Sequence, residues 1–213
     1  MPLSNFDTAV IGAGVFGVWT AWHLRRAGHS VLLLDAWGPG HTRSSSGGET
    51  RIIRMGYGAD EIYTQMSMRS MTLWQELFRE TEQPLFHRTG VLWIARESDS
   101  QSAATRATLA RTGVVHEIVP IEEVARRYPQ IRIDVPDAYG IYEPDSGALM
   151  ARRAVAAVAD SAIRNGVQYA SEAVPAPVSV PVAAAPVSPP PPHAVRARAS
   201  PPTPTPAITA LRL

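Results

Sequence analysis

The sequence predicts an α/β fold followed by a disordered C-terminal tail. Three observations lead to this expectation. Short β-favouring runs alternate with helix-like segments, a glycine-rich turn separates the first strand from the first helix, and the composition changes abruptly near residue 171. Alternation of strands and helices is typical of an α/β domain built around a parallel sheet.

Composition narrows the classes of partner. The chain has 213 residues, 45% of them apolar, and a formal net charge of +1, which gives no general attraction to nucleic acid or to anionic lipid. No cysteine is present and all 20 basic residues are arginine, so the chain offers neither a thiolate nor an amine base. The first residues lack a leader pattern, and no apolar run reaches the roughly 18 residues of a membrane span. We expect a cytoplasmic protein that binds small molecules, without nucleic-acid or membrane partners.

The first elements form a predicted β-α-β unit. Residues 8–11 are a short β-favouring run that stops at a glycine, and a helix is expected from Val15 to Ala27, ended by Gly28. A second strand is expected over residues 31–34.

The rest of the chain up to residue 170 continues the alternation. Apolar periodicity and breakers predict helices at 61–79, 98–111, 121–127 and 151–163, and strands at 90–94, 114–119 and 167–169. Because the parallel sheet is incomplete, we expect the apolar face of helix 151–163 to be uncovered and the chain to be poorly soluble.

The glycine-rich turn carries the first chemical signal. Gly12, Gly14 and Gly17 match the pattern G-x-G-x-x-G directly after a strand and at the start of a helix. Gly12 permits the tight turn, Gly14 the approach of a pyrophosphate and Gly17 close helix packing, while the helix that begins at Val15 presents free N–H groups to the anion. Asp35 ends the second strand, where a carboxylate accepts hydrogen bonds from ribose hydroxyls. These features predict a Rossmann-like site for a dinucleotide, either NAD or FAD.

A second segment separates these two cofactors. Three serines and two glycines at 44–48 lead into Thr50-Arg51-Ile52-Ile53-Arg54. By spacing alone this could be a surface loop with solvated or salt-bridged arginines. With His41-Thr42, Met55-Gly56-Tyr57-Gly58, Thr89-Gly90-Val91-Leu92 and residues 142–147, it resembles the N-terminal portion of the sarcosine oxidase and N-methyltryptophan oxidase family, within the D-amino-acid oxidase superfamily.

The resemblance covers roughly residues 5–170 and implies FAD as cofactor, a monomer, and oxidation of a secondary amine or N-methyl amino acid to an imine with oxygen as acceptor. It implies that Ser45 and Thr50 lie in the cofactor site, that Arg51 lies against the flavin ring and that Arg54 binds the substrate carboxylate. A cation near the ring stabilises its reduced anionic form, and a guanidinium suits a carboxylate. Family members often have a His-His pair where this chain has Ser46-Gly47, so the substrate stays open.

The resemblance also implies a division of the chain. Residues 5–84 would begin the FAD-binding domain, 85–148 would be part of a substrate domain, and 149–170 would return to the FAD-binding domain. Composition, and not the resemblance, predicts that residues 171–213 are a disordered tail rich in proline and alanine. The later lysines and the flavin-linked cysteine of the family are absent here. We therefore expect a truncated and impaired oxidase produced by a frameshift or truncation near residues 171 to 175, with a genuine linker or secreted tail as the alternative.

Other functional readings stay open. A second polypeptide could supply the missing half, the chain could be a non-catalytic FAD- or ADP-binding remnant, or it could be an NAD-dependent dehydrogenase. No metal site is expected, because His87, His116 and His193 have no partners at metal-ligand spacing.

Overall fold

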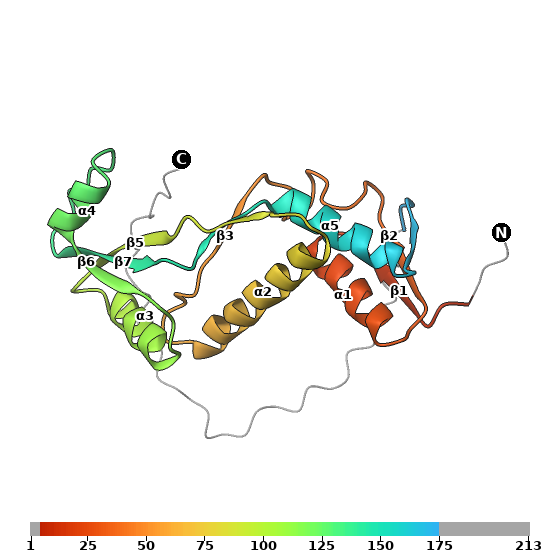
Figure 1. Cartoon of the computed structure of the whole chain (residues 1–213), viewed down its shortest axis with the longest axis horizontal. Helices are drawn as coiled ribbons and strands as arrows, with labels where there is room; N and C mark the ends of the chain where they lie inside the picture. The colour runs from red at the N-terminus through yellow and green to blue at the C-terminus, as the bar shows by residue number, and fades with distance from the viewer. Residues whose placement is uncertain (1–4, 175–213) are drawn as a thin grey trace, which may run out of the picture. The chain divides into compact units, whose positions relative to one another are not determined.

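The computed structural model describes residues 5–174, and its elements alternate as an α/β protein (Figure 1). They are β1 (Thr8–Ile11), α1 (Val15–Arg26), β2 (Val31–Leu34), β3 (Arg51–Ile53), α2 (Glu61–Glu80), β4 (Phe86–His87), β5 (Val91–Arg96), α3 (Ser100–Arg111), β6 (Glu117–Pro120), α4 (Ile121–Arg127), β7 (Ala138–Glu143), β8 (Gly147–Leu149), α5 (Ala151–Arg164) and β9 (Gln168–Ala170). The predicted fold class is confirmed, and the part of the predicted tail from residue 175 onwards lies outside the described residues.

The first sheet is parallel and contains the predicted β-α-β unit, which is formed by β1, α1 and β2. Its strand order is β1-β2-β9, with Thr8 opposite Val31 and Leu33 opposite Tyr169. Val31 and Leu33 are buried, as expected for strands that are covered by helices. Strand β9 follows α5, so the chain returns to this sheet only after the elements from β3 to α5.

Helices α1 and α5 pack against each other beside this sheet. The indole N–H of Trp22 on α1 donates to the hydroxyl of Ser161 on α5 at 3.1 Å, and both side chains are buried. The face of α5 that we expected to be uncovered is instead buried through its alanines and valines, among them Ala154, Val155 and Val158. That expectation was wrong because small side chains let α1 approach α5 closely.

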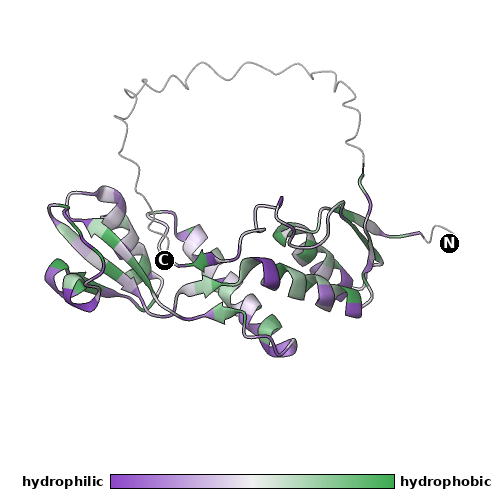
Figure 2. Cartoon of the chain, turned by 90° about the horizontal axis from the view of Figure 1, so that it is seen from above, coloured by the Kyte–Doolittle hydropathy of each residue, from purple (hydrophilic) through white to green (hydrophobic). Residues whose placement is uncertain are grey.

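Two antiparallel sheets make up the middle of the sequence. One has the order β3-β8-β4 and the other β5-β7-β6. Helix α2 contributes to two apolar clusters: Trp74, Leu77 and Phe78 pack with α1 and α5, whereas Met71 packs with Met55 and the β5-β7 side. Figure 2 shows apolar residues both on the strands and on the helices.

The predicted helices are all present, and none of their ends differs from the predicted one by more than two residues. The strand expected at 114–119 begins only at Glu117, because the Val114 N–H donates to Leu109 O and extends the turn after α3. Strands β3, β4, β7 and β8 were not predicted. Among residues 5–174, no helix is long and apolar enough to cross a membrane.

Candidate functional site

The glycine turn joins β1 to α1 and brings them unusually close. Gly12 has φ of 100°, a conformation that favours glycine, and its N–H donates to Leu34 O at the end of β2 (2.7 Å). A Cβ atom at Gly17 would lie 1.7 Å from Gly12 O, so any side chain there would push the helix off the turn. The close packing expected at Gly17 is therefore present.

The N-terminus of α1 faces the loop at 44–46. Gly14 is the N-cap residue and no side chain caps the helix. The N–H of Val15 reaches the Ser46 hydroxyl only at 3.4 Å, and a Cβ at Gly14 would lie 4.0 Å from Ser44 Cβ. Uncapped N–H groups beside a glycine that leaves space fit the pyrophosphate of a dinucleotide such as FAD.

Asp35 is buried where β2 ends, beside the glycine turn. Its Oδ2 accepts from the Ala13 N–H at 2.7 Å, and its Oδ1 accepts from the N–H groups of Trp37 and Gly38 at 2.7 and 2.8 Å. Burial by itself would raise the pKa of Asp35, but these hydrogen bonds together outweigh it and hold the pKa below its ordinary value. The carboxylate thus fixes the glycine turn, and its predicted contact with ribose stays a prediction.

The serine-rich loop brings three predicted residues together. The guanidinium of Arg51 donates to the backbone oxygens of Ser45 and Thr50, so it folds back over the loop. Glu49 anchors the loop to α5, because its backbone oxygen accepts from the Ala151 N–H at 2.9 Å. Arg51 itself is exposed at the start of β3, directly after the loop that reaches the start of α1.

Arg54 lies in a slot with aromatic walls. Its guanidinium is 4.2 Å from the centroid of the Trp93 ring and 4.5 Å from that of Tyr57, and it donates to Gly56 O. No ion pair within residues 5–174 includes Arg54. A half-buried guanidinium on aromatic faces and without a carboxylate partner can receive the carboxylate of a ligand.

Sequence reasoning missed the residues that surround Arg54. Tyr57 belonged to a segment that carried the resemblance and Trp93 to the predicted strand 90–94, but no role was assigned to either. Glu143, at the end of β7, accepts from the N–H groups of Met55 and Gly56 at 2.6 and 3.1 Å. Glu143 belongs to the segment 142–147 that carried the resemblance, which was the signal that could have drawn attention to it, but no role was assigned to it.

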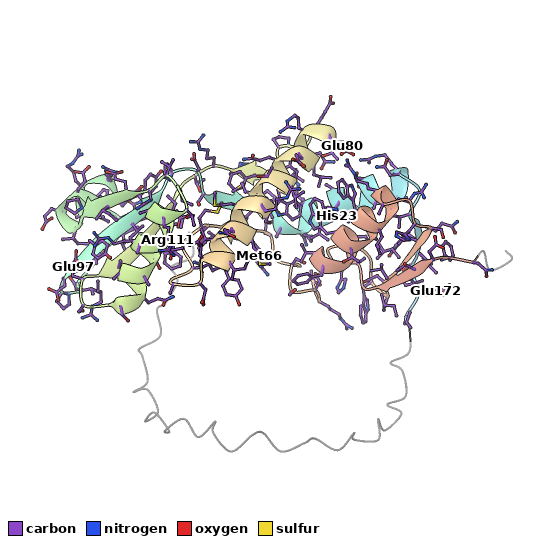
Figure 3. The ribbon with its side chains drawn as sticks, turned by 90° about the horizontal axis from the view of Figure 1, so that it is seen from below. His23, Met66, Glu80, Glu97, Arg111 and Glu172 are labelled. Atoms are coloured by element: carbon purple, nitrogen blue, oxygen red, sulfur yellow. The ribbon has the colours of Figure 1, made fainter. Side chains whose placement is uncertain are left out.

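A hollow between two helices does not coincide with these residues. A groove of about 660 Å³ runs between α1 and α2, lined by Phe16, Trp19, His23 and Trp74 among others. His23 on α1 and Met66 on α2 are labelled in Figure 3. Burial, together with Arg26 and Arg69 nearby, holds the pKa of His23 below its ordinary value, so this imidazole is neutral at pH 7. We interpret the groove as apolar surface rather than as the chemical site. Within the described residues, no group of three His, Asp or Glu side chains could hold a metal ion.

The parallel strands, the glycine turn and the acid that ends β2 define a Rossmann-like dinucleotide-binding protein. Residues 7–177 match the family described as DAO, FAD dependent oxidoreductase, and the chain belongs to this family. It is 35% identical over 167 residues to monomeric sarcosine oxidase of Bacillus sp. (strain B-0618), covering 78% of this chain and 42% of that protein. It is 37% identical over 172 residues to N-methyl-L-tryptophan oxidase of Escherichia coli (strain K12 / DH10B), covering 79% of this chain and 43% of that protein.

Solved structures agree with this assignment. The open form of NikD, described as an unusual amino acid oxidase essential for nikkomycin biosynthesis, has a TM-score of 0.64 and 27% identity, with 78% of this chain and 42% of that chain covered. Glycine oxidase from Bacillus cereus has a TM-score of 0.60 at 19% identity, covering 78% of this chain and 46% of that chain, and shows the fold alone. The chain thus spans less than half the length of the relatives that it matches.

Proposed function

We propose that this chain binds the ADP half of FAD and is the nucleotide-binding part of an oxidase for secondary amines or N-methyl amino acids. The observation that carries the proposal is the joined geometry at the glycine turn: Asp35 holds the Ala13 N–H, α1 begins uncapped, and the Ser44 to Ser46 loop lies beside it. The carboxylate at the end of β2 suits ribose hydroxyls and disfavours a 2′-phosphate.

Arg51 and Arg54 would have separate roles, the first toward the cofactor and the second toward the substrate. Arg51, at the exposed end of the serine-rich loop, would stabilise negative charge on the reduced ring of the cofactor. Arg54 would bind and orient the substrate carboxylate, so that the amine carbon lies over the ring. FAD, when bound, supplies the two-electron acceptor, with oxygen as the terminal oxidant and the imine as product. Ser45 and Thr50 would contribute to the cofactor site through the loop that they form with Arg51.

Titration of the full chain with ADP, FAD and NAD⁺ by calorimetry tests this proposal. We expect ADP to bind, FAD to bind more tightly than ADP, and NAD⁺ to gain nothing over ADP. Asp35→Ala should weaken ADP binding by at least ~10-fold, since the glycine turn loses its anchor. Thr20→Ala on the exposed side of α1 is the control and should leave binding unchanged. Absence of ADP and FAD binding contradicts the proposal, and tighter binding of NAD⁺ than of FAD favours a dehydrogenase.

Catalysis is proposed only for the assembled oxidase fold. The relatives extend over more than twice the matched length, so further flavin and substrate contacts would come from a second polypeptide or a longer chain. We expect no hydrogen peroxide from sarcosine or N-methyl-L-tryptophan with the chain alone. We expect peroxide after addition of the portion of the Bacillus sarcosine oxidase that this chain does not match. Peroxide without that addition would contradict the expected impairment, and ADP binding without peroxide in either case would favour the non-catalytic remnant.

A further inference from the structure

Glu143 is a buried carboxylate that the proposed function does not use. It ends β7 and is 1% exposed, compared with 8% for Asp35. No ion pair within the described part of the chain includes it. A buried carboxylate without a cation is stable only where several donors converge on it. These donors show what Glu143 holds in place.

Three donors from two segments meet this carboxylate. Its Oε2 accepts from the Met55 N–H at 2.6 Å and from the Ser146 hydroxyl at 2.7 Å, and its Oε1 accepts from the Gly56 N–H at 3.1 Å. The β3-β8 ladder ends with Ile53 opposite Gly147. Glu143 therefore takes over as hydrogen-bond partner of the backbone where the strand pairing stops.

The backbone held by Glu143 is the one that positions Arg54. Gly56 O accepts from the Arg54 guanidinium, and the Ser67 hydroxyl on α2 donates to Arg54 O at 2.6 Å. A Cβ at Gly56 would lie 3.1 Å from Glu143 Oε1 and 3.6 Å from Trp93 Nε1. The carboxylate and the Trp93 wall of the slot thus both lie close to the Gly56 backbone, on the side where a Cβ would project.

We propose that Glu143, supported by Ser146, is a positioning residue that aligns the Arg54 guanidinium for an incoming carboxylate. This inference rests on the proposed role of Arg54 as a carboxylate receptor. The negative charge of Glu143 is satisfied by backbone N–H groups and a hydroxyl, so it organises the slot without neutralising the guanidinium. A carboxylate suits this position because both oxygens accept only, whereas one end of an amide would donate toward a backbone N–H.

The test uses two-dimensional NMR of the full chain labelled with ¹⁵N, following the side-chain Nε–H signal of Arg54. This signal should be shifted by the ring currents of Trp93 and Tyr57, and it is assigned by its loss in Arg54→Gln. Acetate is the probe and acetamide the neutral control. In the wild-type chain we expect acetate, and not acetamide, to move the Arg54 signal.

Glu143→Gln should bring the Arg54 signal back toward its ordinary position and weaken acetate binding roughly 10-fold, with ADP binding unchanged. Ser146→Ala removes one of the three donors and should give a smaller change in the same direction, roughly 2- to 3-fold, which keeps the test usable if Glu143→Gln does not fold. Glu123→Gln is the matched control, because Glu123 is a half-buried carboxylate on α4 that accepts hydrogen bonds from Arg126 and Arg127, away from the Arg54 slot.

The outcomes separate the two claims. If acetate moves the Arg54 signal equally in the wild-type chain and in both Glu143→Gln and Ser146→Ala, the positioning role is wrong while the role of Arg54 stands. If acetate does not move the signal in the wild-type chain, the role of Arg54 in the proposed function fails, and the positioning role fails with it. A parallel loss of acetate and ADP binding in both variants would show a purely structural residue and overturn the inference.

Discussion

Replacement of Gly17 by alanine tests the close approach of α1 to the glycine turn. The added Cβ would lie 1.7 Å from Gly12 O, and real Cβ contacts are essentially never shorter than 3.0 Å, so the two must separate by about 1.3 Å. Overpacking of this kind costs about 1–3 kcal/mol and can cost more. Alanine has a higher helix propensity than glycine, which offsets about 1 kcal/mol of this cost. Because the overlap is with backbone and not with a flexible side chain, the upper end of that range, about 3 kcal/mol, applies, and we expect a net loss of about 2 kcal/mol in the free energy of unfolding.

Urea denaturation and a thermal melt of both proteins measure this loss. A net loss of about 2 kcal/mol corresponds to a fall in Tm of about 4–8 °C for a domain of this size. The same displacement moves the N–H groups of the turn out of hydrogen-bonding distance, so ADP affinity should fall at least ~10-fold. Thr20→Ala, on the same helix and exposed, should change stability by less than about 0.5 kcal/mol. Unchanged stability and ADP affinity in Gly17→Ala would refute the close approach on which the nucleotide site depends.

Three further predictions concern stability and solubility. Asp35→Ala should lower the free energy of unfolding by about 2–4 kcal/mol at pH 7, since three backbone N–H groups lose their acceptor. Because the folded-state pKa of Asp35 is depressed, its contribution is full above the unfolded pKa of about 3.9 and is lost as pH falls through the lower folded value. Urea titrations from pH 7 to pH 3 should therefore show the deficit of the variant shrinking, and a constant deficit would contradict the ionised role. Trp22→Phe should cost about 1–2 kcal/mol, because Ser161 on α5 loses its buried donor, and a melt that matches the wild type would argue against the α1-α5 contact. Phe16 and Met66 are 85% and 59% exposed beside the groove between α1 and α2. The double variant Phe16→Ser with Met66→Gln should therefore raise the monomer fraction measured by light scattering without lowering Tm. Unchanged self-association would show that the chain associates through a different surface.

The helices and the first β-α-β unit were predictable because their signals are local. Apolar periodicity in α2 and α5 and the breaker Gly28 after α1 each act within a few residues. The short strands were not predictable in the same way. Strands β3, β4 and β8 are two or three residues long, and their pairing partner, rather than their own composition, makes them strands.

The candidate site was predictable only in part. Gly12, Gly17 and Asp35 could be placed from spacing, because a strand, a tight turn and a helix leave few conformations between them. Arg54 could be named from the resemblance, but its aromatic slot could not, since Trp93 comes from β5 and reaches Arg54 only through the β5-β7 sheet.

The sequence by itself determined the glycine turn, the helix that follows it and the acid that ends the second strand, because each depends on backbone freedom and hydrogen bonding between near neighbours. Only the tertiary structure decided that Glu143 would hold Met55, which lies 88 residues earlier, and that β9 would join β2. Such contacts depend on how whole sheets and helices pack. A buried carboxylate needs hydrogen-bond donors, and only the tertiary packing brings donors that are distant in the sequence next to it.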